Sequence, residues 1–193
     1  MKTISAHLTL LIMALTFGGC SAIVSETSGD QPVGTDQTER SFGRLIDDQL
    51  IEVYIGANLR KADPGYKSAH IQVVSFNGIV LLVGQVKSEQ LLAEASKIAS
   101  QVRNVKRVHN KLTISGPISL PARSNDKWLK TKIKTRMLGT KGINTLEVKV
   151  VVENGVVYLM GLVDKPQADL AIEISRKTYG VQKIVKVFEY SGE

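Results

Sequence analysis

The sequence is poor in the residues that build crosslinks, metal centres and hydrolytic active sites. Its 193 residues include one cysteine, three histidines, one tryptophan and five prolines. A single cysteine excludes an intrachain disulfide and a cysteine-based metal cluster. The sequence also contains no nucleophilic triad order, no phosphate-binding loop and no zinc-ligand spacing. We therefore expect no enzymatic activity, no cofactor and no bound metal.

The three histidines do not indicate catalysis. His7 belongs to the N-terminal segment described next, and His70 and His109 fall in different predicted strands. Neither strand histidine has an acidic or cysteine partner at the spacing of metal ligands. We interpret both as surface or half-buried strand residues.

Long hydrophobic runs are also scarce, and the clearest one lies at the N-terminus. Met1-Lys2 is a short basic start, and Leu8 to Phe17 is an apolar run that is too short to span a bilayer. Gly18-Gly19 then precedes the lone Cys20. This arrangement resembles a bacterial lipoprotein signal, which predicts removal of residues 1–19 and acylation of Cys20.

The residues after Cys20 predict the membrane in which the lipid anchor is inserted. Ser21 stands where an aspartate commonly retains lipoproteins in the inner membrane, so the resemblance implies the outer membrane, with the protein facing the periplasm. Residues 20–43 are rich in Ser, Thr, Gly, Gln and Asp and lack apolar periodicity. We expect this segment to be a flexible tether.

One pattern occurs twice in the rest of the chain. Asn77-Gly78 and Asn154-Gly155 each separate two apolar, β-branched runs, and each is followed by a strand glycine, Gly84 or Gly161. Asn-Gly between such runs predicts a β-hairpin, because a type I′ turn needs positive φ at both central residues. Two hairpins of one design indicate a duplicated module.

The periodicity around each hairpin predicts the order α-β-β-α-β. Residues 44–115 form the first domain, 116–124 the linker and 125–193 the second domain. The first helix of domain one is expected to begin at a cap, Asp47-Asp48, and the first helix of domain two is expected to run from Asn125-Asp126 to Leu138. The fold class is α+β, and each domain is a three-stranded mixed sheet with two helices on one face.

The two first helices differ in charge. The formal net charge of the chain is +7, which favours an acidic partner. The helix over Asp47–Lys61 has three acids and two bases, whereas the helix over Asn125–Leu138 has five bases and one acid. Export from the cytoplasm argues against nucleic acid, so the second helix predicts contact with an anionic membrane surface.

The second helix also carries the only tryptophan. Leu129, Ile133 and Met137 form its core stripe, and Trp128 lies on the opposite side at about 100° per residue. Indole favours the membrane interface, although packing of Trp128 against the first domain is an alternative. The predicted lipid-binding residues are Trp128, Lys127, Thr131, Lys132, Thr135 and Leu138.

The repeated motifs resemble the BON domain family of bacterial envelope modules. The resemblance rests on the Asn-Gly hairpins, on Leu82-Val83-Gly84 and Leu159-Met160-Gly161, and on the entries to the last strands, Val105–Val108 and Val181–Ile184. It implies an α-β-β-α-β fold. Two such domains behind a lipoprotein signal imply binding of anionic phospholipid, such as phosphatidylglycerol, through the second domain.

The same resemblance implies enrichment at division sites and support of envelope integrity. A different function class remains open, because the same helix face or a sheet edge could bind an envelope-assembly or cell-wall protein. In that case the chain would be a protein-interaction adaptor.

Overall fold

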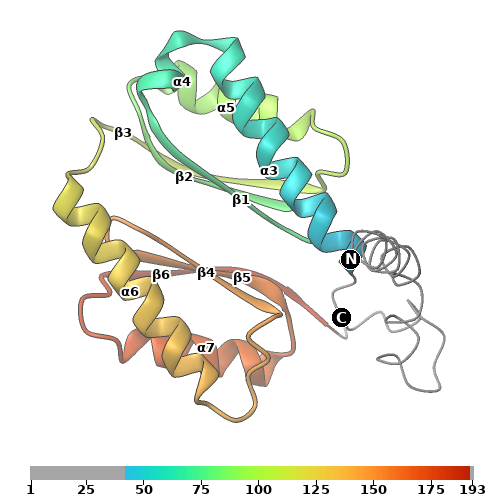
Figure 1. Cartoon of the computed structure of the whole chain (residues 1–193), viewed down its shortest axis with the longest axis vertical. Coiled ribbons are helices and arrows are strands. Elements are labelled where there is room, and N and C mark those ends of the chain that lie inside the picture. The colour runs from blue at the N-terminus through green and yellow to red at the C-terminus, as the bar shows by residue number, and fades with distance from the viewer. Residues whose placement is uncertain (1–41, 192–193) are drawn as a thin grey trace, which may run out of the picture. The chain divides into compact units, whose positions relative to one another are not determined.

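The computed structural model describes residues 42–191 (Figure 1). The predicted signal peptide 1–19, Cys20 and residues 20–41 of the predicted tether lie outside these residues. All described residues belong to one compact unit. We call residues 42–114 module one and residues 120–190 module two.

Module one has the predicted element order with one short helix added. Its elements are α3 (Phe42–Ala62), α4 (Pro64–Ser68), β1 (His70–Phe76), β2 (Ile79–Val86), α5 (Glu89–Ser100) and β3 (Arg107–Ile114). Strand β2 pairs antiparallel with β1 and parallel with β3, so the predicted mixed sheet is confirmed. The added helix α4 has Pro64 in its first turn and Asp63 as its N-cap, where proline and a short acidic side chain are favourable.

Module two repeats this topology. Its elements are α6 (Leu120–Leu138), β4 (Val148–Glu153), β5 (Val156–Val163), α7 (Lys165–Arg176) and β6 (Lys183–Tyr190). Strand β5 pairs antiparallel with β4 and parallel with β6. The duplicated fold expected from the sequence is therefore confirmed.

Both hairpin turns have the predicted conformation. The φ angles are 54° at Asn77 and 79° at Gly78, and 48° at Asn154 and 73° at Gly155. Positive φ at both central positions is the requirement of the type I′ turn, and asparagine and glycine tolerate it best. The local Asn-Gly signal was sufficient to place both turns.

The predicted starts of both first helices were wrong. Helix α3 begins at Phe42, and α6 begins at Leu120 after Ser119, whose hydroxyl accepts a hydrogen bond from the Ala122 amide. Part of the segment predicted as a linker, residues 120–124, is therefore helical. Asp48 and Asp126 lie inside the helices, so they do not cap them.

The two aspartates bind the hairpin turns instead. Asp48 is buried and accepts hydrogen bonds from the amides of Asn77 (2.9 Å) and Gly78 (3.0 Å). Asp126 accepts the same bonds from Asn154 (2.7 Å) and Gly155 (2.8 Å). A carboxylate that satisfies two turn amides fixes the helix over its hairpin, and it places Asp48 and Asp126 at equivalent positions.

Each sheet has its two long helices on one face, as predicted (Figure 1). The helix-covered faces form two separate hydrophobic cores, one in each module. The other faces of the two sheets share a third apolar cluster with residues from both modules, which includes Phe76, Leu81, Val151, Tyr158 and Met160. The modules thus pack sheet against sheet, and their helices form the outer layers.

Polar contacts also join the two modules. Lys149 Nζ lies 2.9 Å from Glu52 Oε1 and donates to the Ser75 carbonyl at 3.0 Å. The Gln85 side-chain amide donates to the buried Glu153 carboxylate at 2.7 Å. Because these partners lie 68 or more positions apart, no local sequence pattern could reveal them.

Candidate membrane-contact site

Helix α6 has a buried face and an exposed face. Leu129, Ile133 and Met137 are at most 1% exposed and form part of the core, as their spacing predicted. Trp128 is 51% exposed and Leu138 is 69% exposed. The alternative in which Trp128 is packed away beneath module one is therefore wrong.

The exposed face of α6 contains four of the six residues predicted to bind lipid. Its members, Trp128, Thr131, Thr135 and Leu138, are all exposed, and we call this surface the outer face of α6. The Thr131 hydroxyl donates to the Lys127 carbonyl one turn earlier at 3.0 Å, so the backbone satisfies its hydrogen-bonding need. This face is therefore less polar than its composition suggests.

Lys132 lies directly beside the indole. Its Nζ atom is 4.4 Å from the centre of the Trp128 ring, which is a cation–π distance. The contact holds a positive charge next to an exposed aromatic ring. A lipid with an anionic headgroup and an apolar chain offers both complementary groups.

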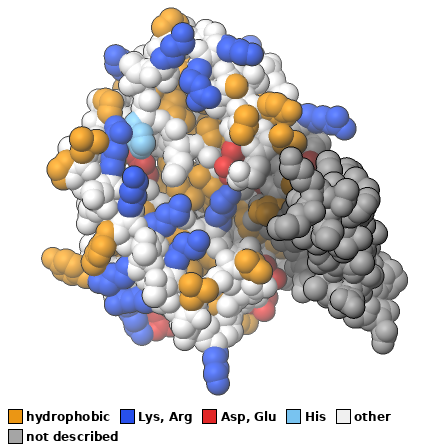
Figure 2. All heavy atoms as spheres, viewed as in Figure 1, with side chains coloured by type: hydrophobic (Ala, Val, Ile, Leu, Met, Phe, Trp, Pro, Cys, Tyr) orange, Lys and Arg blue, Asp and Glu red, His pale blue; other side chains and the backbone are white. Residues whose placement is uncertain are grey.

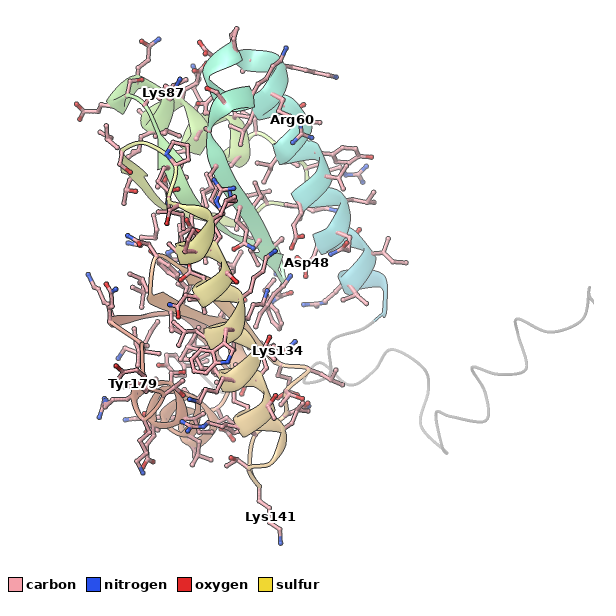
Figure 3. The ribbon with its side chains drawn as sticks, turned by 60° about the vertical axis from the view of Figure 1, so that its left-hand side comes forward. Asp48, Arg60, Lys87, Lys134, Lys141 and Tyr179 are labelled. Atoms are coloured by element: carbon pink, nitrogen blue, oxygen red, sulfur yellow. The ribbon has the colours of Figure 1, made fainter. Side chains whose placement is uncertain are left out.

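A row of cations runs along one side of the same helix. Arg123, Lys127, Lys130 and Lys134 follow the spacing i, i+4, i+7 and i+11, so they line one flank of α6, which we call the cationic flank. Figure 2 shows Lys and Arg side chains spread over the side of the molecule on which α6 lies, and Lys134 is labelled on α6 in Figure 3.

Lys130 is a half-buried member of this flank. Burial lowers its pKa, and the nearby charges of Lys134 and Lys149 lower it further, while Glu52 opposes them. Lys130, Lys134 and Lys149 thus lie near a single acid, Glu52, and Lys149 is already bound to it. An anionic group placed beside Lys130 and Lys134 would relieve this repulsion.

Only part of the cationic flank was predicted from the sequence. Lys127 was predicted to bind lipid, but Lys130 and Lys134 were not. Arg123 was assigned to the linker, because the helix was expected to begin at Asn125. The i, i+4, i+7, i+11 spacing was the signal that could have identified the complete row.

The two strand histidines show no catalytic arrangement. His70 Nε2 lies 3.5 Å from Glu153 Oε2 of module two, a contact that the sequence analysis did not foresee. Burial lowers the pKa of His109, and Arg107 and Lys111 lower it further, so this imidazole is neutral at pH 7. Among residues 42–191, no three or more His, Cys, Asp or Glu side chains are arranged to hold a metal ion.

A cavity of about 350 Å³ lies where α3 meets the β1–β2 turn. It contains the adjacent acids Asp47 and Asp48, but Asp48 is already bound to the turn amides and to the Ser75 hydroxyl at 2.7 Å. The Lys106 ammonium donates to the side-chain oxygen of Asn77, which also accepts a bond from Arg44. Asp48 therefore serves the turn and is not available as one of a pair of catalytic carboxylates.

Comparison with protein families identifies both modules. The BON domain model matches residues 47–116 and residues 125–192. The chain belongs to the BON-domain family. The resemblance deduced from the hairpins and strand ends is thereby confirmed, and modules one and two are tandem BON domains.

The chain is also similar to proteins of several bacteria. The chain is 36% identical over 185 residues to "Outer membrane lipoprotein DolP" of Haemophilus influenzae, with 95% of each chain covered. It is 36% identical over 151 residues to the "21 kDa hemolysin" of Actinobacillus pleuropneumoniae, with 78% of each covered. It is 29% identical over 188 residues to "Osmotically-inducible protein Y" of Escherichia coli, covering 95% of this chain and 92% of that protein.

Within the part of the chain that the structure describes, no helix is both long and apolar enough to cross a membrane.

Proposed function

We propose that this BON-domain protein is a non-enzymatic outer-membrane lipoprotein that binds anionic phospholipid through α6. The observation that carries the proposal is the exposed Trp128 ring with Lys132 at 4.4 Å, next to a row of four cations. The equivalent helix of module one has no such row. The lipid site therefore belongs to module two alone.

The composition of this surface suits the headgroup region of a bilayer. Indole is amphipathic and is enriched at the membrane interface. Each lysine near an anionic surface contributes about 1 kcal/mol, and salt weakens this attraction. Three or four lysines and one inserted tryptophan together give several kcal/mol, which is enough for reversible docking of a tethered protein.

The anchor completes this proposal. Acylated Cys20 would hold the protein to the outer membrane, facing the periplasm, and the Haemophilus influenzae relative is named an outer membrane lipoprotein. Several acyl chains on one residue provide stable attachment. Docking of α6 would then act on lipids of the same leaflet, in support of envelope integrity and at division sites.

Vesicle binding tests the proposal. The soluble chain 21–193 keeps every residue of the three apolar clusters and removes only the acylated end. Trp128, the only tryptophan, should shift its fluorescence to the blue with vesicles containing phosphatidylglycerol and not with vesicles of phosphatidylcholine alone. In co-sedimentation, Trp128→Glu should weaken binding roughly 10- to 100-fold, because a carboxylate replaces the inserted ring beside anionic lipid.

A matched control uses another exposed aromatic residue of module two. Tyr179 is 87% exposed and lies outside α6 (Figure 3), so Tyr179→Glu adds the same charge without touching the outer face. This variant should bind vesicles like the parent. If Trp128→Glu also binds like the parent, the lipid proposal fails and the adaptor function becomes the better explanation.

A further inference from the structure

Helix α3 of module one has an exposed apolar face of its own. Five large side chains on this helix are between 42% and 59% exposed: Leu45, Ile46, Leu50, Val53 and Tyr54. No other helix among the described residues exposes as many large apolar side chains. A patch of this kind on a soluble domain usually marks an interaction surface.

The spacing of this patch is that of a helix–helix seam. Ile46, Leu50, Val53 and Ala57 follow i, i+4, i+7 and i+11, and we call this stripe the α3 seam. The core residues Ile51 and Ile55 lie on the opposite side of the helix and are buried. Helix α3 therefore has two apolar stripes, of which its own module uses one.

The bilayer is a poor occupant for the α3 seam. None of the seam residues is a lysine, and the flank equivalent to that of Lys130 has Glu52 instead. The two sheets pack against each other, so α3 and α6 belong to separate outer layers (Figure 1).

The seam is complementary to itself when two helices run antiparallel. A two-fold axis at Val53 places Leu50 of one copy level with Gly56 of the other and one residue from its Ala57, so a large side chain meets small ones. The same axis brings Asp47 of one copy within about 3 Å, along the helix axis, of the level of Lys61 of the other. Opposite charges then meet at both ends of the seam.

We infer that the α3 seam binds a second copy of this chain in an antiparallel, two-fold symmetric pair. This interaction is independent of the proposed lipid binding, because the outer face of α6 stays free in each copy. A single helix pair covers less than the about 800 Å² per partner of a standard interface. The pair is therefore weak in solution, and attachment of both copies to one membrane would strengthen it through their effective concentration.

Cysteine cross-linking tests the pair directly. The soluble chain 21–193 has no cysteine, so a single introduced thiol can form only intermolecular disulfides. Val53→Cys lies at the two-fold axis and should cross-link at least about 10-fold faster than Thr131→Cys under the same oxidant. Thr131 is the matched control, because it holds the position in α6 that Val53 holds in α3 and is likewise exposed.

Sedimentation equilibrium provides a second readout without oxidation. The parent chain should show a concentration-dependent dimer between tens of micromolar and one millimolar, and Val53→Lys should remain a monomer with an unchanged circular dichroism spectrum. Thr131→Lys should dimerise like the parent. A parent that stays monomeric over this range, or equal cross-linking of the two cysteine variants, would overturn the inference.

Discussion

Helices α3 and α6 hold equivalent places in two copies of one fold, yet their outward surfaces differ. The aspartates that bind the hairpin turns align Asp48 with Asp126, so Leu50 corresponds to Trp128 and Tyr54 to Lys132. Both helices keep the same buried stripe. The two modules therefore share the residues that pack their cores, while their outward residues differ in charge and polarity.

Because the interiors of the two modules are equivalent, the same substitution at equivalent buried positions should cause large and similar losses of stability in both. A Cβ atom at Gly84 would lie 1.9 Å from the His70 carbonyl oxygen, and one at Gly161 would lie 2.0 Å from that of Glu147. Both glycines also have positive φ. Gly84→Ala and Gly161→Ala should each lower the free energy of unfolding by roughly 3 kcal/mol or more, measured by urea denaturation.

Gly116 provides the control for this comparison, because an added Cβ there meets nothing within 4 Å. Gly116→Ala should change stability by less than about 0.5 kcal/mol. If only one of the two strand glycines proves sensitive, the equivalence of the modules at this position is wrong.

The cations that α6 has and α3 lacks predict a smaller effect, which is on vesicle binding. Replacing Lys130 and Lys134 by Gln removes two cations from the flank of α6, at about 1 kcal/mol each, so affinity for phosphatidylglycerol vesicles should fall roughly 10- to 30-fold. The dependence of binding on salt should weaken at the same time. Co-sedimentation over a range of salt concentrations measures both.

The control for this double variant removes the same charge elsewhere. Lys141 and Lys165 are exposed and lie outside α6, and their replacement by Gln should lower affinity only a few-fold. Equal losses from the two double variants would show that net charge alone, and not the cationic flank, attracts the membrane.

The smallest predicted effect is on stability and concerns Tyr66, a buried residue of α4 in module one. It has no counterpart in module two. Its hydroxyl donates to the Leu91 carbonyl at 2.6 Å, and burial, with Glu94 and Asp63 nearby, raises its pKa to about 12. A tyrosine with a raised folded pKa stabilises the fold below pH 10, and this contribution is lost as pH rises from 10 to 12.

Tyr66→Phe should lower stability by about 1 kcal/mol at pH 7 and flatten the loss between pH 10 and pH 12. Urea denaturation at several pH values gives both quantities. The variant should keep part of the alkaline loss, because burial and Glu153 also raise the pKa of Tyr158 in module two. An unchanged alkaline profile would contradict the assignment to Tyr66.

Features that depend on neighbouring residues could be predicted from the sequence. The Asn-Gly turns need positive φ at adjacent residues, so a dipeptide was enough to place them. The exposure of Trp128 followed from its angle to Leu129 and Ile133, because helical periodicity separates buried from exposed faces.

Features that depend on distant contacts were missed. Asp48 resembled part of a helix cap, because an acidic pair before an apolar run is a cap signal, and Asp126 was placed at the start of its helix. The partners of both carboxylates lie in turns about 30 residues away. The stacking of the two sheets depends on the shapes of two complete faces. The α3 seam was overlooked because the periodic signal of α3 was attributed to its core stripe alone.

The most direct test of the account moves the indole from one module to the other. The variant Leu50→Trp with Trp128→Leu keeps one tryptophan and places it at the equivalent position of α3. With phosphatidylglycerol vesicles, the parent should show a blue shift, whereas the exchanged variant should show none and bind at least about 10-fold more weakly. A blue shift of equal size from the indole at position 50 would contradict the claim that module two alone contacts the membrane.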